Sequence, residues 1–207
     1  YNGVNAHSIV YSALEQVRLL EDMDFTEIKI SLKASDVSLT IEAYEKMSQM
    51  VDYPLHLGVT EAGPKLRGIV KSAIGIGTLL SKGIGDTIRV SLTGDPIEEV
   101  RVGREILRSL GLLEEGVDII SCPTCGRTKI KLIKLVEEAE DKLKDIKRPL
   151  KVAIMGCPVN GPGEAREADI GIAGGDGVGI IFKKGKVIKK VKEEFLIDEL
   201  MKEIDNL

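Results

Sequence analysis

The residues best suited to chemistry are three cysteines in the C-terminal half of the chain, Cys122, Cys125 and Cys157. Cys122 and Cys125 form a C-P-T-C motif directly after residues 117–121, and Cys157 opens a C-P-V-N-G-P-G-E loop directly after residues 148–155. Both preceding segments have the apolar, β-branched pattern of strands. Parallel strands that end side by side would bring the two loops together at one edge of a sheet. The sequence therefore predicts a shared thiolate site in which backbone N–H groups of the loops hydrogen-bond the sulfurs.

Several kinds of thiolate site compete for this pattern. A thioredoxin-like dithiol needs only one C-x-x-C and leaves Cys157 unexplained. Structural zinc usually takes four Cys or His ligands, and the only two histidines, His7 and His56, lie in the other half of the chain. A disulfide framework calls for an even number of cysteines and an oxidising compartment. An iron–sulfur cluster with three Cys ligands and one oxygen ligand fits the odd count best, with zinc and a redox dithiol as the alternatives.

The composition excludes several other classes of protein. The chain of 207 residues is 43% hydrophobic and 30% charged, with a net charge of -4, few aromatic residues and no Trp. These values give no sign of a nucleic-acid or membrane-surface binder, and no apolar run is long enough to span a bilayer. The first residues, Y-N-G-V-N-A, lack both an initiator Met and the features of a signal peptide. We expect a cytoplasmic protein whose sequence begins inside a structural unit, as a fragment would.

The first half predicts alternating strands and helices. Strand patterns cover residues 27–33, 55–60 and 87–92, and helical patterns cover residues 12–23, 37–51 and 68–83. This order predicts parallel strands with right-handed crossovers. Polar residues follow the strands, at the end that carries the active site in βα-barrels; they are Asn5, Lys33, Ser35, Asp36, Glu61, Arg89 and Ser91. Any one of them is explained as a helix cap, but Lys33, Glu61 and Arg89 together favour a binding site.

The second half predicts a separate α/β domain. The turn Gly94-Asp95-Pro96 is a plausible boundary, which gives domains of residues 1–94 and 95–207. Strands are expected at residues 117–121, 148–155, 170–173, 178–182 and 186–191, and helices at 97–110, 130–146 and 196–204.

Long motifs throughout the chain resemble one known family. They are G-V-N-A-H-S at 3–8, S-L-K-A-S-D at 31–36, P-L-H-L-G-V-T-E-A-G at 54–63, V-K-S-A-I-G-I-G at 70–77 and G-I-G-D-T-I-R-V-S-L at 83–92. With the two cysteine loops, they identify the chain as similar to the 4-hydroxy-3-methylbut-2-enyl diphosphate synthase family of the methylerythritol phosphate route to isoprenoids.

The resemblance implies a fold, a cofactor and a reaction. The fold would be the second half of a TIM-type βα-barrel (the substrate domain), followed by a small α/β iron–sulfur domain related to sulfite and nitrite reductase domains. A [4Fe–4S] cluster would be bound by Cys122, Cys125, Cys157 and Glu164. The reaction would be the reductive ring opening and dehydroxylation of 2-C-methyl-D-erythritol 2,4-cyclodiphosphate, with electrons from ferredoxin or flavodoxin. Family members act as homodimers.

The resemblance also assigns roles to individual residues. Lys33 and Arg89 would bind the diphosphate, and Asn5, Ser91 and Asn160 would add hydrogen bonds. Glu61 would be the acid that protonates the departing hydroxyl, and Glu164 a displaceable cluster ligand. Without the Cys157 loop, Glu164 would be interpreted as a surface or helix N-terminal carboxylate; the alternative interpretation of Asn160 is a turn residue in a Gly-Pro loop.

The resemblance covers only part of a barrel. Family barrels have eight strands and this chain supplies motifs for about four, so we expect exposed core-like surfaces and weak catalysis by the isolated chain. The main alternative function is a non-catalytic electron-transfer module. Such a carrier needs no substrate pocket, so Lys33, Glu61 and Arg89 argue against it.

Overall fold

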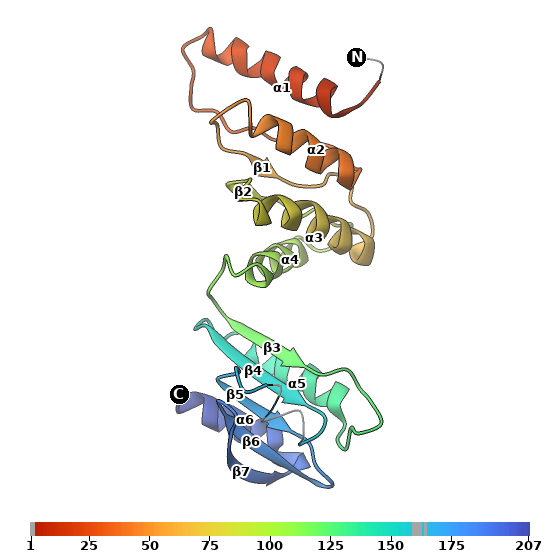
Figure 1. Ribbon diagram of the computed structural model, residues 1–207, viewed down its shortest axis with the longest axis vertical. Helices are drawn as coiled ribbons and strands as arrows, with labels where there is room; N and C mark the ends of the chain where they lie inside the picture. The colour runs from red at the N-terminus through yellow and green to blue at the C-terminus, as the bar shows by residue number, and fades with distance from the viewer. Residues whose placement is uncertain (1–2, 159–162, 164) are drawn as a thin grey trace. The chain divides into compact units, whose positions relative to one another are not determined.

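The computed structural model describes residues 3–158, 163 and 165–207. The chain forms two compact units, Tyr1–Leu113 and Glu114–Leu207, and each is described by itself (Figure 1). In the described part of the chain, no helix is long and apolar enough to cross a membrane.

The first unit alternates helices with short parallel strands. Its elements are α1 (Ala6–Glu21), α2 (Val37–Met47), β1 (His56–Leu57), α3 (Lys65–Ser81), β2 (Thr87–Ile88) and α4 (Pro96–Ser109). Strand β1 pairs in parallel with β2, and Ile30 forms an isolated parallel bridge with Leu55. Three parallel segments therefore lie side by side in the order 27–33, 55–60, 87–92, which confirms the predicted βα order.

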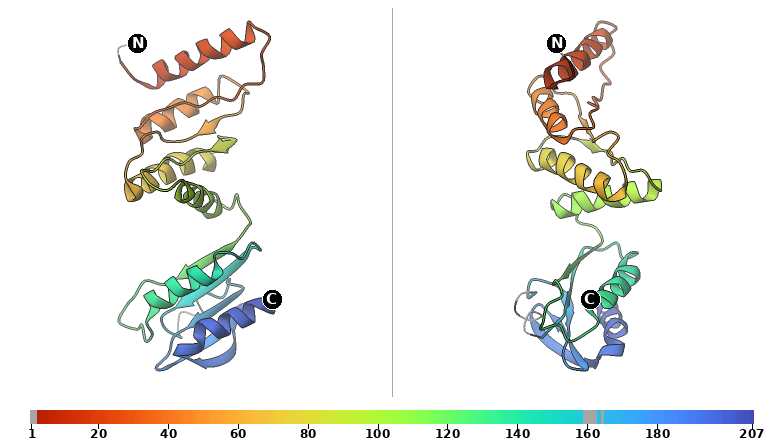
Figure 2. Two further views of the ribbon diagram at one scale, coloured as in Figure 1. Left: turned by 180° about the vertical axis from the view of Figure 1, so that it is seen from behind. Right: turned by 90° about the vertical axis from the view of Figure 1, so that its right-hand side faces the viewer.

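One side of these three segments forms the core of the first unit. Ile30, Leu32, Leu57 and Val90 are buried because every second residue of a strand faces the same side. The helices pack on that side one after another, α1 on α2 and α2 on α3 (Figure 2). Buried helix residues complete this core; they include Val10, Leu14, Tyr44, Met47, Ile76 and Leu79.

Side-chain caps fix where the helices begin. Asn5 and Ser8 form a reciprocal capping box, in which the Ser8 N–H donates to Asn5 Oδ1 at 2.9 Å. Helix α1 therefore begins at Ala6 instead of the predicted residue 12. Asp36 caps α2 through Leu39 N–H at 2.7 Å, as expected for a short polar residue after a strand.

Helix α4 belongs to the first unit by its contacts. Its Ile106 is buried in the first unit's core, and Gly103 lies against Ile88 and Val90. The two compact units accordingly divide after Leu113, whereas the turn at Gly94 had marked the expected boundary.

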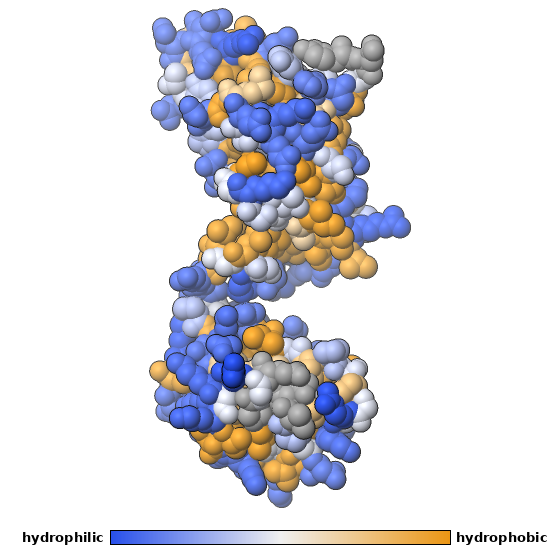
Figure 3. Space-filling view, viewed as in Figure 1, coloured by the Kyte–Doolittle hydropathy of each residue, from blue (hydrophilic) through white to orange (hydrophobic). Residues whose placement is uncertain are grey.

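Apolar side chains remain exposed on the outer helices of the first unit. Figure 3 shows them gathered over the region of α3 and α4. The exposed hydrophobic residues of these two helices include Leu66, Val70, Ile74, Ile97 and Val100.

The second unit is one mixed sheet covered by two helices. Its elements are β3 (Val117–Ser121), α5 (Leu132–Leu143), β4 (Leu150–Met155), β5 (Ile170–Ala173), β6 (Val178–Lys183), β7 (Lys186–Lys192), a 3₁₀ turn (Glu193–Phe195) and α6 (Leu196–Asp205). The sheet order is β3-β4-β5-β6-β7. Strands β3, β4 and β5 are parallel, and the pairs β5–β6 and β6–β7 are antiparallel.

Helices α5 and α6 lie on one face of this sheet (Figure 2, right). Their apolar residues, including Leu135 and Leu200, pack with Val152, Ile154 and Ile172 into one buried cluster. Beneath the opposite face, Met155, Ala168 and Phe182 belong to a second cluster. Apart from the exposed Lys151, the residues of β4 and β5 are buried, and their sequences are accordingly almost entirely apolar.

Candidate functional site

The three cysteines follow two neighbouring parallel strands. Ser121 at the end of β3 pairs with Ile154 near the end of β4, so the loops that carry Cys122 and Cys157 leave the sheet at the same edge. The Gly156 N–H donates to Cys122 Sγ at 3.3 Å, which links one cysteine loop to the other. We call this end of β3 and β4, with Cys122, Cys125 and Cys157, the cysteine edge.

The three thiols have different surroundings. Cys157 is buried, Cys122 is half-buried and Cys125 is exposed. A hydrogen bond from the backbone of Arg127 is the largest influence on the pKa of the Cys125 thiol and lowers it. Burial, the second-largest influence, raises this pKa, and the Thr128 hydroxyl and the Arg127 side chain lower it further. Backbone N–H groups near thiolates favour the charged form that binds metals.

Further backbone contacts join the two loops. The Cys125 N–H donates to Thr128 Oγ1 at 3.1 Å, and the Lys129 N–H donates to the Gly156 carbonyl at 3.0 Å. A Cβ on Gly156 would lie 3.0 Å from both Oγ1 and Cγ2 of Thr128. Glycine at position 156 therefore allows the C-P-T-C turn to pack closely against the loop that leads to Cys157.

The donor chemistry of the cysteine edge fits an iron–sulfur group. Cysteine thiolates with N–H donors aimed at sulfur are the usual surroundings of such clusters. In the described residues no three His, Cys, Asp or Glu side chains already form a metal-binding group. The predicted residues Asn160 and Glu164 lie outside the described residues, so the structure places neither of them.

A second candidate surface lies in the first unit, on the side of its strands opposite the core. The side chains there are polar, and the parallel register sets them in rows. Extending the Ile30–Leu55 and Leu57–Ile88 pairs puts Lys33, Gly58 and Arg89 in one row. The neighbouring rows hold Ser31, His56 and Thr87, then Thr60 and Ser91. We call this surface the polar face.

Arg89 lies on the polar face in the 87–92 segment, next to Gly58. Its Nε is buried without a hydrogen-bond partner among the described residues. A Cβ at Gly58 would lie 2.7 Å from the Arg89 carbonyl oxygen and 3.5 Å from Nε, so only glycine at position 58 leaves room for the arginine.

The pKa of His56 is lowered in part by the positive charge of this surface. Burial, and then the positive charges of Lys29, Arg89 and Lys33, lower the pKa of His56. Its Nδ1 lies 2.7 Å from Thr87 Oγ1. A neutral ring surrounded by three cations marks a place where an anion would be stabilised.

Glu61 stands in the loop after the 55–60 segment with unusual backbone geometry. Its φ of +50° lies in the left-handed region, which costs a non-glycine residue energy and often marks functional sites. The Thr60 N–H donates to the Ala34 carbonyl at 3.0 Å, so the loops after Lys33 and before Glu61 adjoin. The side chains of Lys33 and Glu61 are both exposed.

Asn5 is occupied differently. Its Oδ1 caps α1, and its Nδ2 lies 3.4 Å from the Gly3 carbonyl. The capping explanation that applies to any single polar residue after a strand therefore describes Asn5, as it does Asp36.

Known protein families match both units of the chain. The GcpE TIM-barrel domain matches residues 1–104, and the GcpE protein C-terminal domain matches residues 118–206. The chain belongs to the GcpE family. The family match confirms the predicted fragment of a TIM-type barrel followed by a second α/β region.

Named relatives in this family align with the whole length of the chain. It is 68% identical over all 207 residues to a protein of Caldanaerobacter subterraneus subsp. tengcongensis named 4-hydroxy-3-methylbut-2-en-1-yl diphosphate synthase (flavodoxin). It is 64% identical over the same length to the protein of that name from Clostridium acetobutylicum. The chain spans 58% and 59% of these two relatives.

Three features of this GcpE family chain were not predicted from its sequence. Tyr44 is fully buried, and its hydroxyl reaches the backbone of Leu32 and His56 behind the polar face. Gly58 and Gly156 allow close packing against Arg89 and Thr128. The strand pattern around His56 gave a signal for Gly58, because a glycine within a strand often marks a close approach; Tyr44 gave none beyond its place on an apolar helix face.

Proposed function

We propose that the chain provides substrate-binding strands and the cluster domain of an iron–sulfur oxidoreductase. The reaction is the reductive opening of 2-C-methyl-D-erythritol 2,4-cyclodiphosphate and loss of a hydroxyl as water, giving 4-hydroxy-3-methylbut-2-enyl diphosphate. The observation that carries this proposal is identity above 60% over the whole chain with relatives named for that product. The polar face and the cysteine edge supply the two kinds of site that the reaction requires.

The cysteine edge is the place for the cofactor. Cys122, Cys125 and Cys157, with Glu164, would hold a [4Fe–4S] cluster, which supplies the electrons of the reduction when it is bound. Glu164 is the weakest donor of this set and is therefore the ligand that can give way. The second unit, a mixed sheet with helices on one face, is in this proposal a relative of sulfite and nitrite reductase domains.

The polar face is the place for the diphosphate. Lys33 and Arg89 share a row on the two segments that flank residues 55–60, and Arg89 has a buried Nε without a hydrogen-bond partner among the described residues. A guanidinium binds phosphate oxygens in a bidentate manner, while the lysine acts as a point charge. Ser91, on the same side of the same strand as Arg89, and Asn160 would add hydrogen bonds. Asn5 would do so only by giving up its contact with Gly3.

Glu61 is the proposed acid. A carboxylic acid beside the bound substrate protonates the hydroxyl as it departs as water. Glu61 comes directly after the 55–60 segment, and its backbone is in the left-handed region. The strain at this position is therefore consistent with a catalytic role.

The proposed partners follow from the relatives. Flavodoxin is the electron donor in their printed name, and we infer the same donor for the protein to which this chain belongs. The working assembly is a homodimer.

The ligand assignment is tested by two substitutions. Cys157→Ser should prevent cluster assembly during anaerobic reconstitution, because it removes a buried thiolate. Glu164→Ala should leave a cluster on three cysteines that loses iron readily. Full and equal iron content in both variants would show that Cys157 and Glu164 are not cluster ligands.

The reaction is tested with a chemical reductant. The reconstituted chain is incubated with dithionite and the cyclic diphosphate, and phosphorus NMR follows ring opening. The open-chain diphosphate should form, and Glu61→Gln should slow its formation roughly 100-fold without changing the iron content. Because the chain holds only part of a barrel, slow turnover is expected; a fully loaded chain that does not bind the cyclic diphosphate would instead identify an electron-transfer module.

A further inference from the structure

A run of cations without a carboxylate partner among the described residues follows the second cysteine. Between Asp118 and Glu137 the sequence holds Arg127, Lys129, Lys131 and Lys134 and no carboxylate. All four side chains are exposed. In the described part of the chain none of them forms an ion pair, whereas other lysines of the same unit do, as in the pairs Lys142–Asp198, Lys183–Glu203 and Lys189–Glu199. We call these four residues the cationic run.

The cationic run is attached to both cysteine loops. Arg127 comes two residues after Cys125, and the Lys129 N–H donates to the carbonyl of Gly156, the residue before Cys157. Lys134 lies in the first turn of α5. These contacts fix the positive charges beside the place where the cluster is proposed to bind.

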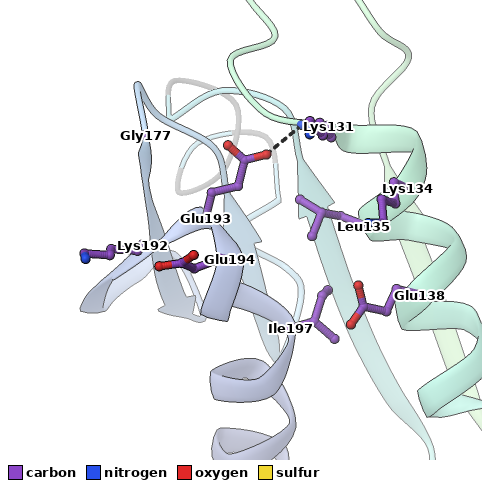
Figure 4. Close-up of a pocket in the computed structure, with 9 residues that line it drawn as sticks. All are labelled: Lys131, Lys134, Leu135, Glu138, Gly177, Lys192, Glu193, Glu194 and Ile197. Carbon is purple, nitrogen blue, oxygen red and sulfur yellow. Dashed lines mark hydrogen bonds between the residues drawn. The ribbon is translucent and has the colours of Figure 1, made fainter.

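A surface pocket of about 580 Å³ lies next to the cationic run, between the start of α5 and the start of the 3₁₀ turn. Figure 4 shows the Glu193 carboxylate directed at Lys131, whose backbone N–H donates to it at 2.9 Å. Glu138 and Glu194 also line the pocket. The pocket is therefore lined by both positive and negative side chains. The uniformly positive surface is that of the cationic run, outside the pocket's carboxylates.

We propose that the cationic run, together with Ile133, is the docking surface for an acidic electron-donor protein; this inference rests on the proposed function. Unpaired, solvated cations beside a redox centre accelerate the approach of a negatively charged protein. Ile133, 64% exposed between Lys131 and Lys134, adds an apolar contact of the kind found inside the polar rim of interfaces.

The hairpin between β6 and β7 provides a matched control. Lys184 and Lys186 are also exposed, and neither forms an ion pair within the described residues. Met155 pairs with Ala173 and Ala173 with Ile180, so the start of β6 lies at the cysteine edge. Lys183 and Lys186 pair at the other end of β6, which places the hairpin cations at the far end of the sheet.

The test compares two double charge reversals of the reconstituted 207-residue chain. Lys129→Glu with Lys134→Glu changes the cationic run, and Lys184→Glu with Lys186→Glu makes the same change of charge at the hairpin. Neither pair includes a proposed cluster ligand. Calorimetry measures the Kd for an acidic flavodoxin at low and at high ionic strength, and iron content and circular dichroism confirm that each variant is loaded and folded.

We expect the cationic-run variant to bind about tenfold or more weakly at low ionic strength and the hairpin variant within about twofold of the parent chain. Salt should weaken the parent chain's binding and reduce the difference. The docking surface would be overturned if both variants lost the same affinity for flavodoxin. It would also be overturned if salt did not change the affinity of the parent chain, or if the parent chain did not bind. Cluster loading and ring opening with dithionite require no donor protein, so failure of this inference is distinguishable from failure of the proposed function.

Discussion

At the scale of single residues, Tyr44 supports the polar face from behind. Its buried hydroxyl accepts from the Leu32 N–H at 3.0 Å and lies within hydrogen-bond reach of the carbonyls of Leu32 and His56. Leu32 directly precedes Lys33 on one segment, and His56 lies two residues before Gly58 on the next segment. The tyrosine therefore joins two neighbouring strands at the level of the proposed diphosphate site.

Removing this hydroxyl should weaken the first unit. Tyr44→Phe leaves the Leu32 N–H and two carbonyls short of a partner in a dry environment, and we expect a loss of about 1–3 kcal/mol in the free energy of unfolding by urea. Tyr53→Phe is the control, because the Tyr53 hydroxyl contacts an exposed Glu21 carboxylate at 2.8 Å. Equal effects of the two substitutions would contradict the role of Tyr44.

His56 gives a pH-dependent test of the polar face. Its pKa in the folded chain is below the ordinary 6.5, because of burial and then of Lys29, Arg89 and Lys33. The neutral ring therefore stabilises the fold fully above the ordinary pKa, and this contribution is lost as pH falls through the folded pKa. Bound diphosphate would offset the three cations and raise the pKa again.

The expected result is an upward shift of the His56 pKa when inorganic pyrophosphate is added, measured by proton NMR of the imidazole. Lys33→Gln should raise the same pKa in the absence of pyrophosphate, since it removes one of the cations. A pKa that neither change moves would mean that the polar face does not bind anions.

At the scale of elements, the second unit follows its sequence closely. The strands at 117–121 and 170–173 are confirmed to the residue, because short runs rich in β-branched residues between turn residues are typical of strands. The segments at 27–33, 55–60 and 87–92 pair regularly over only short stretches. Pairing depends on the neighbouring strand, which the pattern of a single segment does not contain.

The candidate site was predicted in part for a similar reason. Strand-end positions found Lys33, Arg89 and the cysteines, because parallel strands place such residues at one edge. The sequence did not separate substrate contacts from caps: Asn5 begins α1, and only the Ser8 three residues later, the partner of a capping box, indicated this. The roles of Gly58 and Gly156 could not be predicted, because they depend on which segment of the chain packs against each glycine.

Gly58 tests the packing of neighbouring strands. In Gly58→Ala the new methyl group would lie 2.7 Å from the Arg89 carbonyl oxygen, so we expect a loss of about 1–3 kcal/mol in the free energy of unfolding and weaker binding of pyrophosphate. Gly77 in α3 has open space around it, and Gly77→Ala should stabilise the helix by up to about 1 kcal/mol. Urea unfolding measures the free energy of unfolding of both variants. No loss of stability in Gly58→Ala would show that the neighbouring strands move apart without cost.

At the scale of the whole molecule, the chain has two compact units with different contributions. The first presents cations on parallel strands, and the second presents thiols at the edge of a mixed sheet. The family and the order of its parts were readable from long motifs, whereas the division after Leu113 depends on the tertiary packing of α4. The chain covers 58% of the length of its relative from Caldanaerobacter.

The central claim is that the second unit binds an iron–sulfur cluster. Its most direct test is the iron, acid-labile sulfide and zinc content of the chain after anaerobic reconstitution. The account predicts about four iron and four sulfide per chain, the content of one [4Fe–4S] centre, with little zinc. About one zinc and no sulfide in a folded sample would contradict it and assign the cysteine edge to a structural metal.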